Sequence, residues 1–241
     1  MLGFICSNDG LGVVLQKDLW TRVLPFVLYM AFIGVEDGMR FLMRPTSDLS
    51  QSSFLYLYPI KVGLVAGVLV ICWSHYREMR FSDLFHWRQT LLSLAVGGGI
   101  FWLWIHMTWD FATLGQPQGF NPNLVPEGFP RAMMIAARLF GAVLVVPVME
   151  ELFWRSFLIR YVIDGNFMQV AVGRFSGFSF LATTVLFGLE HHLFLAGMVA
   201  GALFNVLLYR TRSIAQCILS HAVANLALGL YVLQSQQWQF W

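Results

Sequence analysis

Residues 145–155 read VVPVMEELFWR and place two adjacent carboxylates, Glu150 and Glu151, inside an apolar stretch. A charged side chain at the centre of a bilayer costs about 2.5–3.5 kcal/mol on insertion scales, so the pair needs a physical reason. On a helix, Glu151 and Arg155 are four residues apart and share a face, whereas Glu150 points about 100° away. Arg155 can therefore neutralise Glu151 and leave Glu150 free.

Pro147 lies just before the carboxylate pair. Because proline removes one helical hydrogen bond, we expect a kink there that opens a water-filled pocket at membrane depth. The competing interpretation is that both glutamates lie solvated at the cytoplasmic end of a helix, beside Arg155 and Arg160.

The composition around this stretch identifies the class of protein. Of 241 residues, 58% are hydrophobic and 12% are charged, against roughly 45–50% and about 25% in a soluble domain. This composition excludes an ordinary soluble enzyme, a disordered chain and a coiled coil. A net charge of +2 is too small for a nucleic-acid footprint. The sequence therefore predicts an all-α, polytopic integral membrane protein that meets its partners in or at the lipid bilayer and binds no nucleic acid.

Stretches of about 20 apolar residues are long enough to cross the hydrocarbon core. We predict about seven such spans, with six to eight allowed, in a single membrane domain that covers residues 1–241. A catalytic helical core is expected at residues 131–233. The predicted spans are residues 19–43, 54–74, 90–109, 131–163, 175–192, 193–209 and 213–233.

Basic residues in short loops set the orientation, because they favour the cytoplasmic side. They follow alternate spans, so we expect a cytoplasmic amino terminus and a multi-pass protein of the bacterial inner membrane, although Arg40 and Arg44 argue weakly against this. Trp238 and Trp241 suit an aromatic belt at the outer interface. The basic residues counted are Arg77, Arg80 and Arg88 after the second span, Arg155, Arg160 and Arg174 after the fourth, and Arg210 and Arg212 after the sixth.

Features of secreted proteins are not expected in this chain. Cys6, Cys72 and Cys217 are odd in number and far apart, which argues against a disulfide framework or a Cys-x-x-Cys metal site. The first twenty residues lack a basic flank followed by an uninterrupted apolar core, so a cleavable signal peptide is not predicted.

Two further polar clusters lie in later spans. Phe187 and His191 are four residues apart, next to Glu190 and His192, and His221 and Asn225 share a face of the last span. A lone histidine here is more often a core or interface residue bonded to a backbone carbonyl. A His and Asn pair can also be a hydrogen bond between helices.

Together the three clusters supply the groups that peptide hydrolysis needs. A carboxylate or imidazole must take a proton from water, and donors must hold the oxyanion. Desolvation makes Glu150 a better base, His191 can position the water, and His221 and Asn225 can donate to the oxyanion. Ser156, Cys217 and Ser220 have no carboxylate and histidine at recognisable spacing, so a serine or cysteine nucleophile ranks low.

At these residues the sequence resembles the CAAX-processing and bacteriocin-processing family of membrane-embedded proteases. Its three motifs occur in order, as Glu150-Glu151 to Arg155, Phe187 to His191, and His221 to Asn225. The resemblance covers residues 131–233. It implies a glutamate-dependent intramembrane endopeptidase in which Glu150 and His191 activate water and His221 and Asn225 hold the oxyanion. Glu151, Arg155 and Phe187 would support the site.

A narrower similarity is to the CAAX-protease-related proteins that accompany exosortase-type sorting systems. It rests on residues 152–158 and on the closing Trp238 to Trp241. It implies a membrane-anchored protein or peptide tail as substrate and a sortase-like membrane partner. Nothing in the sequence identifies a prenyl-binding groove.

Three other functions compete with this interpretation. Glu150, His191 and His221 could ligate zinc, although the His-Glu-x-x-His signature is absent; we expect neither a metal nor another cofactor. The clusters could form an ion path, but no paired halves mark an inverted repeat. The protein could also be a non-catalytic scaffold that binds a substrate tail or a partner.

If each predicted span crosses the membrane completely, the predicted site residues lie at different depths. This places Glu150 near the cytoplasmic end of the fourth span and His191 near the outer end of the fifth, so the two could not meet. They meet only if the fourth span begins nearer Arg138 and breaks at Pro147, or if the fifth span tilts.

Overall fold

The computed structural model describes residues 9–43, 48–115 and 119–241. The predictions for Cys6 and Arg44 lie outside these residues. The described residues form helices and no strand, which confirms the all-α prediction. The main helices are α1 (Asp9–Met43), α2 (Asp48–Leu55), α3 (Leu57–Ile71), α4 (Trp87–His106), α5 (Phe129–Phe140), α6 (Val146–Glu151), α7 (Ile159–Ile163), α8 (Gly177–Leu189), α9 (Phe194–Thr211) and α10 (Ile214–Ser235).

Two π-helical turns, Gly141–Val145 and Leu152–Leu158, join α5, α6 and α7. The result is a continuous helix over Phe129–Ile163, which we call the long helix. In a π-turn the hydrogen bonds reach one residue further than in an α-helix, and such turns occur frequently at functional sites. The carboxylate pair lies between the two turns.

Six helices in the described part of the chain are long and apolar enough to cross a membrane, which confirms the polytopic class. The fifth predicted span, residues 175–192, is the exception. It corresponds to α8, whose 13 residues rise only about 20 Å against about 30 Å of hydrocarbon. The six long helices are Gln16–Met43, Ser52–Ile71, Trp87–His106, Phe129–Ile163, Phe194–Thr211 and Ile214–Ser235.

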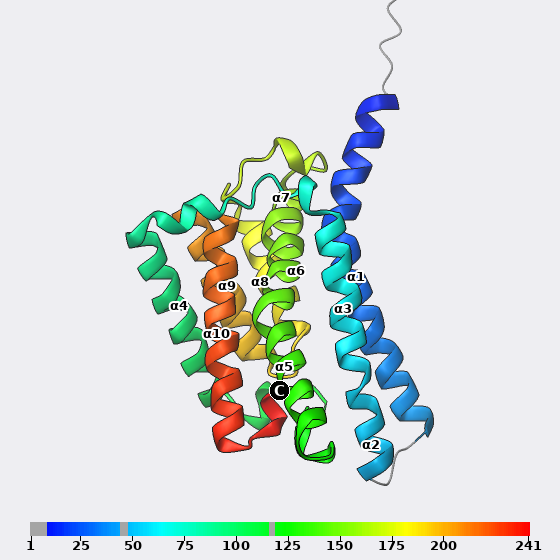
Figure 1. Ribbon diagram of the computed structural model, residues 1–241. Helices are drawn as coiled ribbons and strands as arrows, with labels where there is room; N and C mark the ends of the chain where they lie inside the picture. The colour runs from blue at the N-terminus through cyan, green and yellow to red at the C-terminus, as the bar shows by residue number, and fades with distance from the viewer. Residues whose placement is uncertain (1–8, 44–47, 116–118) are drawn as a thin grey trace, which may run out of the picture.

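The helices form two groups on either side of the long helix (Figure 1). α1 packs against α3 on one side, and α4 packs against α10 and α8 against α9 on the other. The turn between α9 and α10 is tight. Arg212 adopts a left-handed conformation with φ 52°, and the Ser213 side chain accepts a hydrogen bond from the Gln216 backbone as a helix N-cap.

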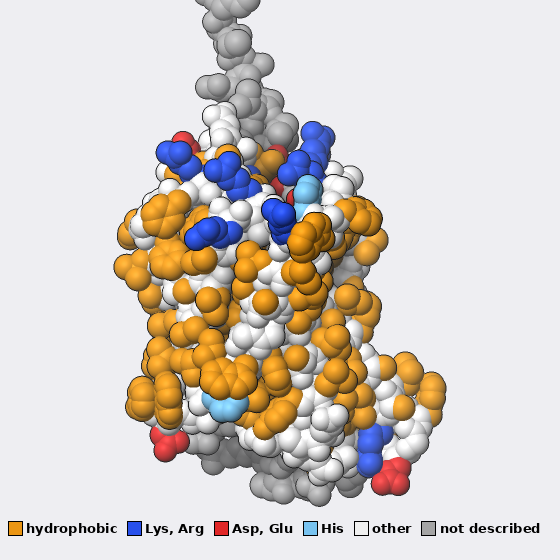
Figure 2. All heavy atoms as spheres, turned by 90° about the vertical axis from the view of Figure 1, so that its left-hand side faces the viewer, with side chains coloured by type: hydrophobic (Ala, Val, Ile, Leu, Met, Phe, Trp, Pro, Cys, Tyr) orange, Lys and Arg blue, Asp and Glu red, His pale blue; other side chains and the backbone are white. Residues whose placement is uncertain are grey.

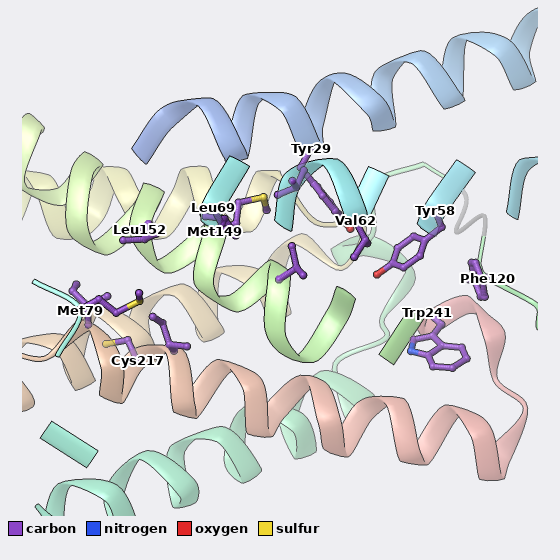
Figure 3. Close-up of a cluster of buried hydrophobic side chains, with 14 of the residues drawn as sticks. Tyr29, Tyr58, Val62, Leu69, Met79, Phe120, Met149, Leu152, Cys217 and Trp241 are labelled. Atoms are coloured by element: carbon purple, nitrogen blue, oxygen red, sulfur yellow. The ribbon is translucent and has the colours of Figure 1, made fainter. Parts of the chain in front are cut away.

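The main apolar core runs along the contact between the long helix and its neighbours (Figure 3). Met149 and Leu152 of the long helix are fully buried there, next to Leu69 of α3 and Cys217 of α10. Cys217 is a free, buried cysteine of this core, and Cys72 is free and half-buried. The carboxylate pair is therefore flanked along the chain by two residues that pack in this core.

Lys and Arg side chains gather at one end of the molecule, beyond a face covered with apolar side chains (Figure 2). The amino-terminal end of α1 lies at this end as well (Figure 1). Two of the basic residues counted in the sequence do not belong to it. Arg155 and Arg160 lie inside the long helix and are 1% and 3% exposed, so they carry no weight in the orientation.

Arg160 instead joins a buried cluster that we call the Glu78 cluster: Arg22, Glu78, Ser156 and Arg160. Arg22 binds Glu78 through both Nε and Nη2, at 2.8 and 2.9 Å, and Ser156 also donates to Glu78. Burial alone raises the pKa of Glu78, but the hydrogen bonds and charge of Arg22 outweigh it and hold that pKa below its ordinary value. The cluster fixes α1 and the segment after α3 to the long helix.

Trp241 differs from the prediction of an interface belt. Its side chain is buried, 9% exposed, and packs on Phe120 and Trp238. The reason is that the segment after α10 turns back over the end of the bundle, which places this ring in the core (Figure 3).

Candidate active site

The structure brings all four predicted catalytic residues to one cavity. This cavity, of about 280 Å³, is lined by Glu150, His191, His221 and Asn225, together with apolar side chains such as Phe187 and Phe204. We call it the central cavity. The three sequence clusters, on three separate helical segments, therefore converge in space.

The short helix α8 resolves the conflict over depth. Because α8 is too short to cross the bilayer, the turn that follows it, with Glu190 and His191, lies above the lower end of α10 (Figure 1). Gly188 permits this turn: a Cβ there would lie 2.7 Å from the Phe194 carbonyl oxygen. Glu150 lies well inside the long helix rather than at its end. Both residues therefore reach the middle of the protein.

Arg155 and Glu151 form the pair that their four-residue spacing predicts. Arg155 Nη1 donates to Glu151 Oε1 at 3.2 Å, and both side chains are almost completely buried. Arg155 also donates to Asn205 Oδ1 and to the Gly201 carbonyl, both at 3.3 Å. Its guanidinium carbon lies 4.5 Å from the centre of the Phe187 ring. The arginine thus ties the long helix to α8 and α9.

Glu151 has a second partner that the sequence did not reveal. His221 Nδ1 lies 2.9 Å from Glu151 Oε1, and because a carboxylate only accepts, Nδ1 donates. Phe204 stacks on the imidazole with ring centres 4.9 Å apart. These contacts orient the other ring nitrogen, Nε2, toward Glu150 Oε2 at 4.0 Å. A carboxylate that fixes the orientation of a functional histidine is a common arrangement in active sites.

Glu150 itself is 5% exposed and lines the central cavity. Its Oε2 has no hydrogen-bond partner among the described residues. Glu151 therefore takes up the charge of Arg155, as predicted, and an oxygen of Glu150 is left for another group.

His191, in the turn after α8, is held by the backbone of that helix. Its Nδ1 lies 2.7 Å from the Phe187 carbonyl and must donate to it, so Nε2 is the nitrogen that remains for the cavity. Trp104 meets the ring edge-on at 5.2 Å. Phe187 thus makes two contacts in the site: its carbonyl accepts a hydrogen bond from His191, and its ring packs on the Arg155 guanidinium.

Asn225 forms a hydrogen bond to the π-turn at a carbonyl that Pro147 leaves without a donor. In that turn Val146 N–H donates to Gly141 O, five residues back. The next bond of this kind would run from residue 147 to Ala142 O, but proline has no N–H. Asn225 Nδ2 donates to Ala142 O at 2.7 Å and replaces the missing bond. One of its two amide hydrogens remains for the cavity.

Sequence reasoning left Glu190 and Arg138 without a role, yet both line the central cavity. Glu190 Oε2 accepts a hydrogen bond from Trp154 Nε1 at 3.2 Å. The position of Glu190 next to His191 was the available signal. For Arg138 there was no such signal, because a spacing of twelve residues places it and Glu150 on different faces of a regular helix.

The described residues contain no group of three or more His, Cys, Asp or Glu side chains placed to hold a metal ion. This geometry gives no support to the set Glu150, His191 and His221 as zinc ligands. Independence of metal remains a prediction.

The fold and the cavity define a polytopic membrane protein with buried carboxylates and histidines at a common site. Residues 132–227 match the family described as Rce1-like, type II CAAX prenyl endopeptidase Rce1-like. This segment is therefore similar to that family, which confirms the resemblance seen in the motifs and indicates a protease. All seven predicted site residues lie within it. No curated protein and no solved structure matches the chain.

Proposed function

We propose that the chain is a glutamate-dependent intramembrane endopeptidase that hydrolyses a peptide bond near a membrane-anchored protein tail. The observation that carries the proposal is that two groups at the central cavity are left for another molecule: the buried Oε2 of Glu150, which has no hydrogen-bond partner among the described residues, and Nε2 of the half-buried His191, whose Nδ1 is used by the Phe187 carbonyl. A water molecule between them would meet two proton acceptors, which is what activation of a nucleophilic water requires.

In the proposed reaction the Glu150 carboxylate takes a proton from this water, and the hydroxide oxygen forms a bond to the peptide carbonyl carbon. The carbonyl oxygen becomes an oxyanion, to which the free N–H of Asn225 donates. His221 donates through Nε2 in its doubly protonated form, with Glu151 accepting from Nδ1. The carbon–nitrogen bond then breaks as the proton held by Glu150 passes to the leaving nitrogen. The products are a carboxyl group and an amine.

Substitution of Glu150 tests the mechanism. Glu150→Ala and His191→Ala should abolish cleavage of a membrane-anchored peptide, measured by mass spectrometry on protein purified in detergent. Glu127→Gln is the matched control, because that carboxylate is 87% exposed and pairs only with the exposed side of Arg131. All variants should elute as the unaltered chain in size-exclusion chromatography. Normal cleavage by Glu150→Ala would refute the glutamate mechanism.

Chelation separates this proposal from the zinc alternative. We expect activity to survive exhaustive treatment with a chelator, and the purified protein to contain no stoichiometric metal. Loss of activity that zinc restores would favour Glu150, His191 and His221 as ligands. If the purified protein cleaves no peptide but still binds a membrane-anchored tail or a sortase-like protein, the non-catalytic scaffold is the better interpretation.

Location in the inner membrane of a bacterium, with a cytoplasmic amino terminus, is part of the same proposal. The gathering of Lys and Arg at the end where α1 begins supports this orientation (Figures 1 and 2). Membership of the exosortase-associated subgroup, with a sortase-like partner, is proposed on the closing tryptophans and residues 152–158 alone.

A further inference from the structure

Arg138 on α5 is a cation that the described residues do not neutralise. No carboxylate in the described ranges lies within 4.0 Å of its guanidinium, and its Nε is buried without a hydrogen-bond partner. Arg138 is half-buried, and a buried donor without a partner is costly, so an unsatisfied Nε beside a cavity points to a ligand. Arg138 lines the central cavity and also a second cavity of about 540 Å³, which we call the vestibule.

Aromatic rings hold the guanidinium in place without removing its charge. Its central carbon lies 4.6 Å from the centre of the Tyr58 ring, 5.4 Å from that of Phe120 and 6.0 Å from that of Trp241. These three side chains lie together at one end of the apolar cluster (Figure 3). Trp241 Nε1 is a second buried donor without a partner among the residues described. Two unsatisfied donors therefore line the same cavities.

Lys61 places a second cation on the same tyrosine. Its Nζ lies 5.3 Å from the centre of the Tyr58 ring. Its nearest carboxylate is Glu36, at 4.0 Å, and Glu36 already accepts from Arg40 at 2.8 Å.

The other acids of the vestibule are also engaged. Glu190 accepts from Trp154, and Asp37 has a partner of its own. Arg138 and Lys61 thus both contact the Tyr58 ring and both line the vestibule.

The separation of Arg138 and Glu150 along the long helix sets the distance between the bound carboxylate and the peptide bond that is cleaved. Arg138, Ala142, Val146 and Glu150 line the central cavity as one stripe of the long helix. The π-turn accommodates one extra residue, so Arg138 and Glu150 are separated by about eleven α-helical steps of 1.5 Å, or about 17 Å. The reach of the two side chains shortens this span. An extended peptide covers about 3.3–3.6 Å per residue, so about three to five residues fit between them.

We propose that Arg138, assisted by Lys61 and Trp241 Nε1, binds a carboxylate of the substrate peptide about three to five residues from the bond that is cleaved. The inference rests on the proposed function, because it assumes that the cavity receives a peptide. The carboxylate is either the carboxyl terminus of the substrate or the side chain of an acidic residue. Arg138 is thus a residue that determines specificity, and Glu150 performs the chemistry.

Peptide binding to the full-length chain with Glu150→Gln tests this inference without turnover. The probes are three N-palmitoylated ten-residue peptides of uncharged sequence in a neutral detergent: one with a free carboxyl terminus, one with a terminal amide, and one amide with aspartate as its last residue. Affinity is measured by tryptophan fluorescence, and mass spectrometry checks that each peptide stays intact. Cleavage by this variant would contradict the proposed function and not the role of Arg138.

A hydrogen bond to a charged group contributes enough for about a 10- to 100-fold difference in affinity. We expect at least one carboxylate peptide to bind tighter than the plain amide by about this factor. Which of the two does so identifies the source of the carboxylate. The added variant Arg138→Gln should reduce the ratio to about one, and Arg138→Lys should keep part of it. Arg131→Gln is the control, because Arg131 also lies on α5 but pairs with Glu127 outside both cavities.

Two results would overturn the inference. One is equal affinity for all three peptides in the chain that keeps Arg138. The other is that Arg138→Gln weakens the carboxylate and amide peptides equally, which would mean that the arginine only supports the packing of Tyr58 and Trp241.

Discussion

Asn225 donates a hydrogen bond to Ala142 O in place of the N–H that Pro147 lacks. The effects of substituting Asn225 and Pro147 on stability should therefore depend on each other. Asn225→Ala removes the donor to Ala142 O, which is 2.7 Å away. A polar group left unsatisfied costs about 1–3 kcal/mol. Asn225 is half-buried beside a cavity that can admit water. We therefore expect Asn225→Ala to lower the free energy of unfolding by about 1–2 kcal/mol.

Pro147→Ala restores the missing N–H, five residues after Ala142 in the register of the π-turn. In that background Asn225→Ala should cost less than about 0.5 kcal/mol, because Ala142 O keeps a donor. The expected coupling between the two positions is thus about 0.5–2 kcal/mol. The assay is equilibrium unfolding in mixed micelles of dodecyl maltoside and sodium dodecyl sulfate, followed by the fluorescence of the nine tryptophans.

The same cycle separates the two roles of Asn225. As an oxyanion donor its loss should lower the rate constant of cleavage by about 10²–10³ in both backgrounds. If Asn225→Ala costs the same stability with and without Pro147, the missing proline bond is not the reason for the contact. If Pro147→Ala also restores the rate, Asn225 acts on the helix and not on the oxyanion.

Two other predictions follow from buried pairs. Glu151→Gln and Arg155→Gln should each reduce the rate of peptide cleavage. The double variant should lose less than the sum of the two single losses, because the two side chains form one pair. Additive losses would contradict this prediction. The pKa of Glu78 is lower in the folded chain than its value of about 4.5 in the unfolded chain, so its charge stabilises the fold at pH values above 4.5. The free energy of unfolding should therefore be higher than that of Glu78→Gln at neutral pH, and this difference should shrink as the pH falls below 4.5. A difference in unfolding free energy that stays constant from pH 7 to pH 3 would exclude a role for its charge.

Much of the site could be predicted because local spacing determines it. The four-residue interval from Glu151 to Arg155 fixes a pair on any helix, and the order of the motifs identifies the residues that converge. Hydropathy likewise identifies the spans, because about 20 apolar residues cross a bilayer whatever their neighbours are.

Contacts between distant segments could not be predicted. The burial of Arg160 depends on Glu78, and that of Trp241 on the return of the last segment over the bundle. The contact between the end of α8 and the next helix depends on the absence of a side chain at Gly188. No local pattern records any of these, and the conflict over depth arose because a full crossing was assumed for α8.

The π-turn at Gly141–Val145 connects the chemistry of the site with its selectivity. In a regular α-helix, twelve residues at about 100° each would leave Arg138 and Glu150 about 120° apart around the axis, and the two could not line one cavity. One extra residue taken up by the turn reduces this angle to about 20°, and both side chains do line the central cavity. Pro147 favours the turn by withholding an N–H, and Asn225 completes its bonding from α10. A residue predicted to donate to the oxyanion therefore also helps to align the cation and the carboxylate between which the substrate would lie.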